Sequence, residues 1–363
     1  MRSKEFNAFL FSIVLLTTIP FLSGCRQTGS ASSRNDTSAS SCDSASEFMV
    51  TSTLDGYLAD TVPADFCFKD RLYIGGENNY YLIDTDGSLV RWGSNWDNWD
   101  TGWDQGGYED ILLQPFSQRN VLVQHAIKYV RSYSASFALD ENHNLWAWSG
   151  SSAWPLSPTE SNIPSNEPRI VMSSVADIAA SDFDVAVVME DSTLRLWGSD
   201  SRLQNPVDIV DDVQKVIHSR DGYYFIDMAG ALYKIDYNPD SGTSAYIEPQ
   251  RYPLESDVVD VADADDPFVG DLLVLKKGGE LELLNTQTYT PKITQLTNQA
   301  ICINGSGFVS SDGNYWRVMI DAGKYKSMKE EKNTVWIVCN FEGDSILITK
   351  DGKIKVQNNS DSK

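Results

Sequence analysis

Hydrophobic and polar positions alternate in short runs along most of this 363-residue chain. In the segment 175–198, VADIAASDFDVAVVMEDSTLRLWG, an apolar run ends in a polar turn, and a leucine with an aromatic residue three positions later follows the turn. Apolar residues at alternate positions, such as Phe183, Val185 and Val187, place one face of a strand against a core. The pattern predicts a β-hairpin around Asp191–Ser192.

This hairpin pattern recurs seven times along the chain. The predicted turns are Asp86–Gly87, Glu141–Asn142, Asp191–Ser192, Ala229–Gly230, Gly278–Gly279, Asp312–Gly313 and Asp351–Gly352. Asp-Gly and Gly-Gly tolerate the positive φ that two-residue hairpin turns require. The residues just after the turns are Leu89, Leu145, Leu194, Leu232, Leu281, Tyr315 and Ile354, so successive copies are 34 to 56 positions apart. Repeats of this length with β-type alternation predict an all-β fold, and seven copies predict a seven-bladed β-propeller.

The two ends of the chain suggest how such a ring closes. The seventh copy ends almost at the C-terminus, so few residues remain there for the outer strands of the last blade. The segment 48–68 precedes the first copy and contains the apolar runs 48–50 and 65–68. We therefore expect this N-terminal segment to complete the last blade.

The first residues of the chain have the pattern of an export signal. Arg2 and Lys4 precede an apolar run over 9–22, and Leu22-Ser23-Gly24-Cys25 follows. A basic start, a short apolar stretch and small residues are typical of a secretory signal. The cysteine after Ser-Gly resembles the lipobox of bacterial lipoproteins, which implies acylation of Cys25, as by palmitate, and two chains suffice for stable anchoring. The alternative is an ordinary signal peptide with an incidental cysteine.

The segment after Cys25 is composed mainly of Ser, Thr, Ala, Gly and Asn, a composition typical of a flexible tether. We therefore divide the chain into a signal peptide (1–24), a Ser-rich tether (25–46) and a single propeller domain (47–363). The mature protein is expected to be exported and held on the extracytoplasmic side of a cell membrane, at a bacterial cell surface, through its lipid alone.

Net charge narrows the choice of partners. The formal charge is −22, and removal of residues 1–24, with two basic residues and one acidic residue, makes it −23. Such a body repels nucleic acid and anionic headgroups. The charge either serves solubility alone or favours cationic partners. We expect a monomer that does not bind nucleic acid.

Four cysteines remain besides Cys25, and disulfides are permitted outside the cytoplasm. Cys302 and Cys339 occupy similar places in the sixth and seventh copies, within apolar runs. Equivalent strand positions on neighbouring blades are usually too far apart for a disulfide. We expect both to be buried free thiols, whereas Cys42 in the tether could pair with Cys67. The cysteine spacing matches no zinc site, and we expect neither a metal nor a cofactor.

The best-preserved copy carries a recognisable signature. It consists of Val175, Ile178, Ala179, Ala186, Leu194, Trp197 and Gly198. This pattern resembles the regulator of chromosome condensation repeat, whose members form seven-bladed β-propellers, and the resemblance extends over residues 67–357. The later copies depart from it, with Ile235, Leu284, Val318 and Gln357 at the tryptophan position. The family includes nuclear exchange factors and bacterial secreted binding proteins. Nothing here matches residues specific to exchange activity.

A search for catalytic motifs points away from an enzyme. The three histidines, His125, His143 and His218, form no H-E-x-x-H motif, and neither a G-x-S-x-G elbow nor a phosphate-binding glycine loop occurs. His143 falls in a predicted turn, where we expect it to be solvated. Two carboxylates could still approach each other across a propeller channel, so a glycosidase-like hydrolase is the enzymatic alternative.

The most unusual local segment is WGSNWDNWDTGWDQGGYED, residues 92–110. Its aromatic and acidic residues alternate: Trp96, Asp97, Trp99, Asp100, Trp103 and Asp104. Exposed tryptophans beside carboxylates suit a protein interface, where Trp is enriched among hot spots, or a sugar-binding face. Alternatively, the rings could pack against outer strands while the acids face water.

Together these patterns predict a lipid-anchored binding protein that does not catalyse a reaction. A protein partner is the first hypothesis, because propeller loops form broad rigid platforms. A cell-surface or cell-wall glycan is the second hypothesis, and hydrolysis is the third.

Overall fold

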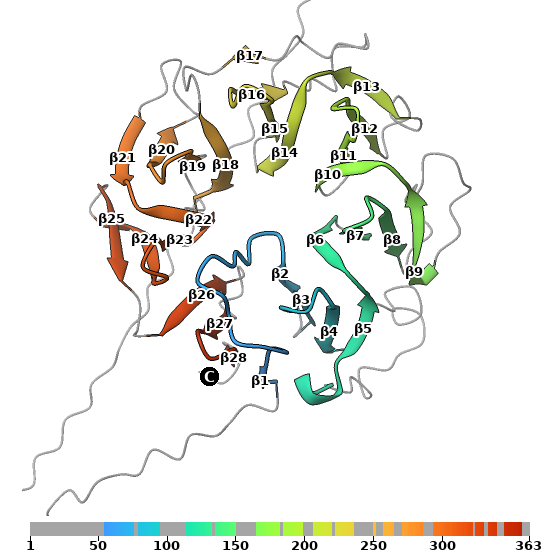
Figure 1. The fold of residues 1–363 in the computed structure, drawn as a ribbon, viewed down its shortest axis with the longest axis vertical. Coiled ribbons are helices and arrows are strands. Elements are labelled where there is room, and N and C mark those ends of the chain that lie inside the picture. Colours follow the sequence, from blue (N-terminus) through green and yellow to red (C-terminus); the bar gives the residue numbers. More distant parts are fainter. Residues whose placement is uncertain are drawn as a thin grey trace, which may run out of the picture. The chain divides into compact units, whose positions relative to one another are not determined.

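The computed structural model is a ring of seven four-stranded antiparallel sheets (Figure 1). It describes residues 54–75, 79–94, 114–132, 135–149, 165–181, 184–198, 206–219, 222–235, 250–251, 257–264, 271–285, 293–321, 324–329, 333–339 and 345–357. The fold is the predicted all-β, seven-bladed propeller. Within the described ranges the helical structure is one turn of 3-10 helix, η1 (Phe116–Gln118). None of their helices could cross a membrane.

The first four blades follow one another along the chain, each running from the axis to the rim. Blade 1 consists of β2 (Leu72–Gly75), β3 (Asn79–Ile83), β4 (Leu89–Gly93) and β5 (Asn120–Val123). Blade 2 consists of β6 (Ala126–Arg131), β7 (Ser136–Asp140), β8 (Leu145–Ser149) and β9 (Ser165–Met172). Blade 3 consists of β10 (Val175–Ala180), β11 (Asp184–Met189), β12 (Leu194–Gly198) and β13 (Val207–Val210). Blade 4 consists of β14 (Val213–Ser219), β15 (Gly222–Asp227), β16 (Leu232–Ile235) and β17 (Gln250–Arg251).

The remaining blades complete the ring. Blade 5 consists of β18 (Val258–Asp263), β19 (Asp271–Lys276), β20 (Leu281–Asn285) and β21 (Ile293–Thr297). Blade 6 consists of β22 (Ala300–Asn304), β23 (Gly307–Ser310), β24 (Tyr315–Asp321) and β25 (Lys324–Lys329). Blade 7 consists of β26 (Thr334–Cys339), β27 (Ser345–Thr349), β28 (Lys353–Gln357) and, from the other end of the chain, β1 (Gly56–Tyr57).

The N-terminal segment closes the ring as predicted. β1 pairs antiparallel with β28, with Gly56 opposite Ile354. The Val356 N–H also donates to the Asp55 carboxylate at 2.8 Å. Among the described residues of the expected segment, Gly56 and Tyr57 form the closing strand, and the chain then turns from the rim towards the axis.

The seven predicted hairpin turns lie between the second and third strands of the blades, but each is one residue longer than expected. In blade 1 the Asp84 N–H donates to the Ser88 carbonyl at 2.9 Å, and the Gly87 N–H to the Asp84 carbonyl at 3.0 Å. In this three-residue loop the last residue has a positive φ, whereas a two-residue turn would need a positive φ at one or both of its central residues. The residues with this positive φ are Gly87, His143, Ser192, Gly230, Gly279, Gly313 and Gly352.

These turns also join neighbouring blades. The Gly87 carbonyl accepts a 2.8 Å hydrogen bond from the Ala126 N–H, at the start of the next innermost strand. The Gly279 carbonyl accepts a 2.9 Å bond from Ala300 in the same way. At the closure, the Gly352 carbonyl accepts a 2.8 Å bond from Leu58, so the N-terminal segment repeats the contact made by a blade.

The hydrophobic core lies between the blades. The tryptophans of the first three copies, Trp92, Trp148 and Trp197, are buried there, and Ile235 and Leu284 fill the same place in the next two blades. The degenerate copies therefore keep a buried apolar side chain at this position, although it is no longer aromatic. One hairpin alone cannot bury its apolar face. In the closed ring, neighbouring blades stack and bury these faces against each other, so the ring is stable.

A substitution at a turn glycine tests this account of blade joining. Gly279 has φ +89°, and a Cβ atom there would lie 2.9 Å from the Ala300 carbonyl oxygen. We expect Gly279→Ala to lower the free energy of unfolding by about 1–3 kcal/mol. Ser192→Gly, at the equivalent turn with φ 68°, should change it by less than about 1 kcal/mol. Urea unfolding followed by tryptophan fluorescence measures both, and equal effects would contradict the account.

Candidate functional site

The chain between β1 and β2, residues 58–71, crosses the central channel (Figure 1). We call this segment the plug. Four other connections from an outermost strand to the next innermost strand need only two residues, as at Gln124–His125 and Ser173–Ser174, and the remaining two need six and four. The plug lies over the turns of the neighbouring blades, where the Val62 N–H donates to the Lys350 carbonyl at 3.2 Å. Its extra length fills the channel that a short connection would leave open.

β-Bulges at the starts of the innermost strands determine which side chains enter this channel. β6, β10, β14, β18, β22 and β26 each shift register between their first and third residues. A bulge re-aims side chains near the end of a strand. The third residues of these strands are Lys128, Asp177, Lys215, Asp260, Cys302 and Trp336. Positive and negative side chains thus alternate around blades 2 to 5.

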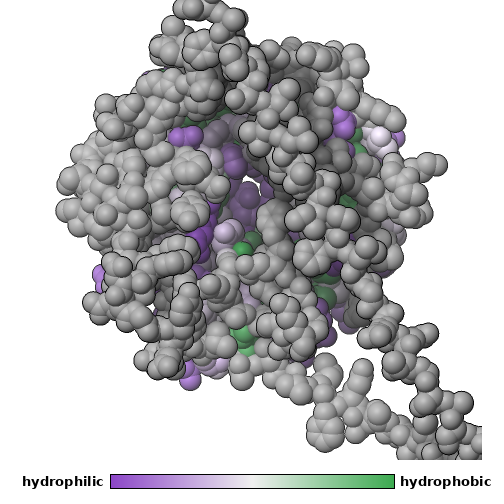
Figure 2. Space-filling model, turned by 180° about the vertical axis from the view of Figure 1, so that it is seen from behind, coloured by the Kyte–Doolittle hydropathy of each residue, from purple (hydrophilic) through white to green (hydrophobic). Residues whose placement is uncertain are grey.

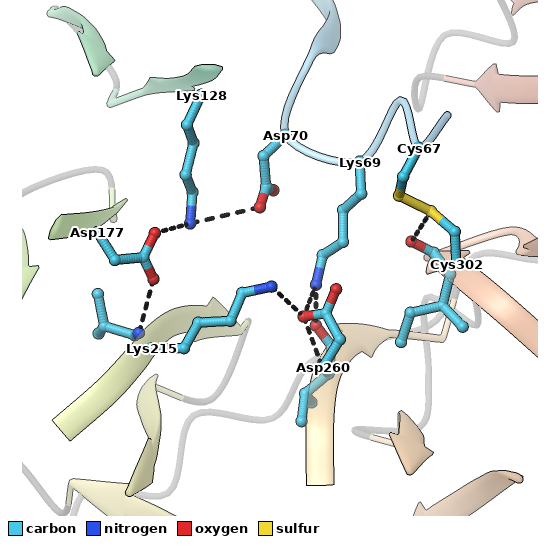
Figure 3. Close-up of polar contacts among 11 residues, drawn as sticks. Cys67, Lys69, Asp70, Lys128, Asp177, Lys215, Asp260 and Cys302 are labelled. Carbon is cyan, nitrogen blue, oxygen red and sulfur yellow. Dashed lines mark hydrogen bonds and ion pairs between the residues drawn. A yellow bond between two sulfur atoms is a disulfide. The ribbon is translucent and has the colours of Figure 1, made fainter. Parts of the chain in front are cut away.

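The plug joins this charged set through two consecutive residues, Lys69 and Asp70 (Figure 3). Asp70 lies 3.3 Å from the Lys128 Nζ, which also donates to Asp177 at 2.8 Å. The other Asp177 oxygen accepts the backbone N–H of Val216 at 2.9 Å. One lysine is therefore held between two carboxylates.

The second group of charges consists of two lysines and one aspartate. The Asp260 Oδ1 atom accepts from both Lys69 and Lys215, and the Lys215 bond measures 2.8 Å. Lys69 also donates to the Val261 carbonyl, and the Val261 N–H donates to Asp260 at 2.8 Å. One carboxylate is held between two ammonium groups, so the two groups together carry no net charge. We call these six side chains the channel network.

The pKa values of Asp70, Asp260 and Lys128 reflect this mutual pairing, whereas burial lowers the pKa of Lys69. Burial alone would raise the pKa of the Asp70 carboxyl, but Lys128 and Lys69 hold it far below its usual value. Burial also opposes ionisation of Asp260, yet Lys69 and Lys215 lower its pKa. Burial would lower the pKa of Lys128, but Asp177 and Asp70 raise it above its usual value. All three groups therefore remain charged across the moderate pH range.

A disulfide between Cys67 and Cys302 attaches the plug to blade 6, with their Cα atoms 5.8 Å apart. The expected free thiol at Cys302 and the pairing of Cys67 with Cys42 are therefore wrong. Equivalent strand positions on neighbouring blades lie far apart. Cys67 lies on the plug, which is not part of any repeat, and the plug brings it to Cys302 at the channel. The side chain of Cys339 and all of Cys42 lie outside the described residues. Beside the disulfide, Phe68 of the plug contacts Trp336, with ring centroids 6.1 Å apart.

The plug divides the channel into two hollows. One has a volume of about 260 Å³ and is lined by later residues of the innermost strands, among them Ile217, His218 and Asp263. The other, of about 410 Å³, lies against plug residues such as Asp65 and Arg71. Figure 2 shows the centre of the ring hollowed, with hydrophilic residues along its wall. Lys69 and Asp70 line both hollows, so the plug and the channel network lie between them.

The structure keeps the three histidines apart. His218 lines the smaller hollow, where its ring contacts Tyr223 at 5.0 Å between centroids. His125 lies 3.1 Å from Glu141 on the turn side of the ring. His143 is in the predicted turn, but it is not simply solvated, because its Nδ1 lies 3.1 Å from the Val175 carbonyl. Among the described residues, no group of three or more His, Cys, Asp or Glu side chains could hold a metal ion.

The candidate residues from the sequence lie outside the described part of the chain. These are Cys25 and the residues Trp96, Asp97, Trp99, Asp100, Trp103 and Asp104. The structure does describe the two ends of the tryptophan segment: Gly93 and Gln114 exchange backbone hydrogen bonds of 2.8 and 2.7 Å. The segment therefore leaves and rejoins blade 1 at one point, at the end of β4 opposite to the Asp86–Gly87 turn.

Sequence reasoning missed the channel network. Its signal was present, because the third residue of each innermost strand reads Lys, Asp, Lys, Asp in the second to fifth copies. An alignment on the turns would have shown part of it, since Lys128, Asp177 and Lys215 each lie 15 positions before the last residue of their turn, whereas Asp260 lies 19 positions before Gly279. The contribution of Lys69 and Asp70 could not be found in this way, since the plug belongs to no repeat.

Comparisons with solved structures support the fold. Yeast RCC1 (Prp20), in a structure bound to Kap60, has a TM-score of 0.52 and 13% identity, over 80% of this chain and 81% of that one. The chain shares the RCC1 propeller fold. Human WBSCR16 has a TM-score of 0.50 and 13% identity, over 74% and 87% of the two chains. Streptogramin B lyase has a TM-score of 0.50 and 11% identity, over 84% and 97%.

Sequence comparison adds no relative: no family model and no curated protein matches this chain. At the identities above, the structural similarity defines the fold and leaves the function to the residues.

Removal of one charge tests the channel network. Lys128→Met leaves the buried Asp177 and the partly buried Asp70 without their shared cation, so we expect the free energy of unfolding to fall by about 3 kcal/mol. Adding Asp70→Asn and Asp177→Asn should recover only part of this loss, because the two carboxylates that lost their cation are then neutral, while Lys69 and Lys215 keep Asp260 as their one carboxylate. Lys277→Met, at an exposed turn, is the control and should change the value by no more than about 0.5 kcal/mol. A loss in Lys128→Met no larger than in this control would contradict the network.

The pH dependence of stability has a defined sign. Because the pKa values of Asp70 and Asp260 are lowered on folding, their contribution is complete above the unfolded value of about 4 and is lost as pH falls. The raised pKa of Lys128 gives a contribution that is present below about pH 10 and lost above it. We expect urea midpoints to be nearly constant between about pH 5 and 9 and to fall on both sides. Lys128→Met should reduce the acid-side loss, and an unchanged acid slope would count against the assignment.

Proposed function

We propose that this protein is a non-catalytic binding platform, exported and anchored to the extracytoplasmic side of a membrane through a lipid on Cys25. The anchor rests on the sequence, where a basic start and a short apolar run precede Leu22-Ser23-Gly24-Cys25. The seven-bladed ring supplies a rigid frame, and its loops supply variable surfaces.

The observation that carries this proposal is the mutual pairing of the charged side chains in the channel. In many ligand sites, a few polar groups converge on an open concave pocket. Here the charged side chains pair with one another, as Lys69 does with Asp260 and Lys128 with Asp70. A disulfide also fixes the plug, which contributes Lys69 and Asp70. A ligand that paired with one of these charges would have to break an existing ion pair. Binding on the outer surfaces of the ring has no such cost.

A macromolecular partner, and a protein first, fits this arrangement best. Two structures with the same fold concern protein binding: yeast RCC1 (Prp20) bound to Kap60, and Prp20p with its binding to Gsp1p and histones. The strongly acidic composition of this chain favours a cationic partner. The segment that contains Trp96, Trp99 and Trp103 offers aromatic hot spots for such a contact.

Two other functions belong to different classes. Stacked sugar rings would use the same tryptophans, with Asp97, Asp100 and Asp104 as hydrogen-bond acceptors, which makes a cell-surface glycan the second candidate. Hydrolysis is the third, and a lyase of the same fold shows that a propeller can support catalysis. The described residues contribute one histidine, His218, to the channel, and it lies beside no second histidine.

The decisive variant is Trp96→Ala with Trp99→Ala and Trp103→Ala in the full chain. We expect the parent, purified in detergent, to retain one protein from the solubilised envelope, and the variant to lose it by about 10-fold or more, as hot-spot residues do. Affinity capture with quantitative mass spectrometry measures this. The control is Trp146→Phe, at a partly buried tryptophan whose Nε1 donates to Asp140 at 2.8 Å.

The outcomes separate the candidate functions. Equal capture by the parent and the triple variant would move the binding site to another surface. If no protein is retained, titration with soluble cell-wall fragments follows, and a tryptophan fluorescence change in the parent alone would favour the glycan function.

A further inference from the structure

Arg71, the last residue of the plug, is a cation that takes no part in the channel network. Its guanidinium lies over the Phe66 ring, with the Cζ atom 4.7 Å from the ring centroid. Within the described residues, no carboxylate forms an ion pair with this guanidinium. Burial alone lowers the pKa of Arg71, since no nearby anion opposes it. A partly buried charge without a counter-ion has lost hydration that no protein group replaces, so an anion from outside would be favourable here.

Arg119 shows the same arrangement with its anion in place. Its Cζ atom lies 4.5 Å from the centroid of the Phe116 ring, and its Nη2 atom lies 3.8 Å from the Asp84 carboxylate. The two arginines have the same aromatic support, and Arg119 is the one with a carboxylate beside it. A guanidinium presents five N–H donors in a planar fork that matches a carboxylate. At Arg71 no described residue accepts a hydrogen bond from this fork.

The surroundings hold Arg71 in place. The Arg71 N–H donates to the Phe68 carbonyl at 3.0 Å, and the Arg71 carbonyl accepts from the Ile83 N–H at 2.7 Å. The Phe66 ring that supports the guanidinium contacts the Phe68 ring edge-on, with centroids 4.8 Å apart. Cys67, between these two phenylalanines, forms the disulfide that attaches the plug to blade 6. The backbone and the supporting ring are therefore fixed before any ligand arrives, which reduces the entropy that binding costs.

Arg71 lines the larger hollow of the channel, about 410 Å³ in volume, which we call the plug-side hollow. Its charged lining residues are Asp65, Lys69, Asp70, Arg71, Lys215 and Asp260. The two lysines share the single carboxylate of Asp260 (Figure 3), which leaves one positive charge in excess. Arg71 adds a second positive charge without a counter-ion.

The other two carboxylates of the lining, Asp65 and Asp70, do not cancel this positive charge. Asp70 pairs with Lys128, and both Lys128 and Asp177 lie outside the lining of the hollow. Asp65 is exposed to water, and in the described chain it pairs with no cation. Solvent screens an exposed charge, so Asp65 opposes an anion only weakly. The plug-side hollow therefore offers two positive charges in excess against one screened carboxylate.

A small organic carboxylate complements these features. Its oxygens would accept from the fork of Arg71 without breaking any ion pair of the channel network, and charge-assisted bonds of this kind are strong. Pro63 and Phe66 give the hollow an apolar part against which a carbon skeleton can pack, and inorganic phosphate would leave that part unused. The volume lies within the roughly 300–1,000 Å³ that is typical of small-molecule sites. A large polyanion would be repelled by the acidic body of the protein.

We propose that the plug-side hollow is a binding site for a small organic carboxylate, which Arg71 holds through its guanidinium fork. The proposal goes beyond the proposed function, because it concerns a small ligand at one end of the channel and not a macromolecule on the outer surfaces. The plug does not have to move, since the hollow already lies on one side of it.

Isothermal titration calorimetry of the full chain, purified in detergent and held at low salt, tests the site. The probe is glutarate. It is compared with 1,5-diaminopentane, which has the same carbon skeleton and the opposite charge, and with inorganic phosphate. Arg71→Met removes the guanidinium and keeps an unbranched side chain. Arg119→Met is the matched control, because it removes the same charge from an arginine that also lies over a phenylalanine but is outside the hollow.

We expect the parent to bind glutarate with a Kd of about 1 mM and to show no measurable binding of 1,5-diaminopentane. Arg71→Met should weaken glutarate binding about 10-fold, as loss of hydrogen bonds to a charged group does, and Arg119→Met should stay within about 2-fold. Asp65→Asn should strengthen binding by about 2-fold, because a like charge is removed from the lining. This opposite sign separates the site from an effect on folding, and it remains measurable if Arg71→Met is unstable.

Several results would overturn the proposal. These are no binding of glutarate by the parent, or equal binding of phosphate or 1,5-diaminopentane. Equal weakening in Arg71→Met and Arg119→Met would assign the effect to net charge alone. Weaker binding in Asp65→Asn would contradict an anion in this hollow. Capture of a partner through the tryptophan segment is measured separately, so the proposed function stands or fails independently of this site.

Discussion

The constraint on which this structure depends is the return of the chain from the rim of the last blade to the axis of the first. β1 is the outermost strand of blade 7 and β2 the innermost strand of blade 1, so residues 58–71 must pass between them. Along this passage the chain crosses the channel. Lys69 and Asp70 complete a network without net charge, and the Cys67–Cys302 disulfide fixes its position. The segment that leads from the closing strand β1 is therefore also the segment that crosses the channel.

The same bulges have two consequences. In β18 the third residue, Asp260, turns into the channel, and the second, Val259, is exposed. Inside the channel the protein satisfies its own charges. Because these charges stabilise the frame by pairing with one another, we propose that partners bind on the outer surfaces of the ring.

Much of the fold follows from the sequence, because the hairpin pattern repeats. The turns at Asp86–Gly87 and Asp351–Gly352, the seven blades and the closing role of the N-terminal segment are all confirmed. The channel network was harder to predict from the sequence, because the plug that contributes Lys69 and Asp70 has no counterpart in the repeats. Cys67 therefore could not be matched with Cys302 by equivalent positions. The tryptophan segment and Cys25 stay predictions, since they lie outside the described residues.

The most direct test of the closed channel is hydrogen exchange of the amides in the plug, measured by mass spectrometry in the oxidised full chain. The account predicts slow exchange for residues 65–71, comparable to the innermost strands, with and without a bound partner. Exchange as fast as in exposed turns, or protection that is lost when a partner binds, would show that the channel opens. Binding would then belong inside the ring and not on its outer surface.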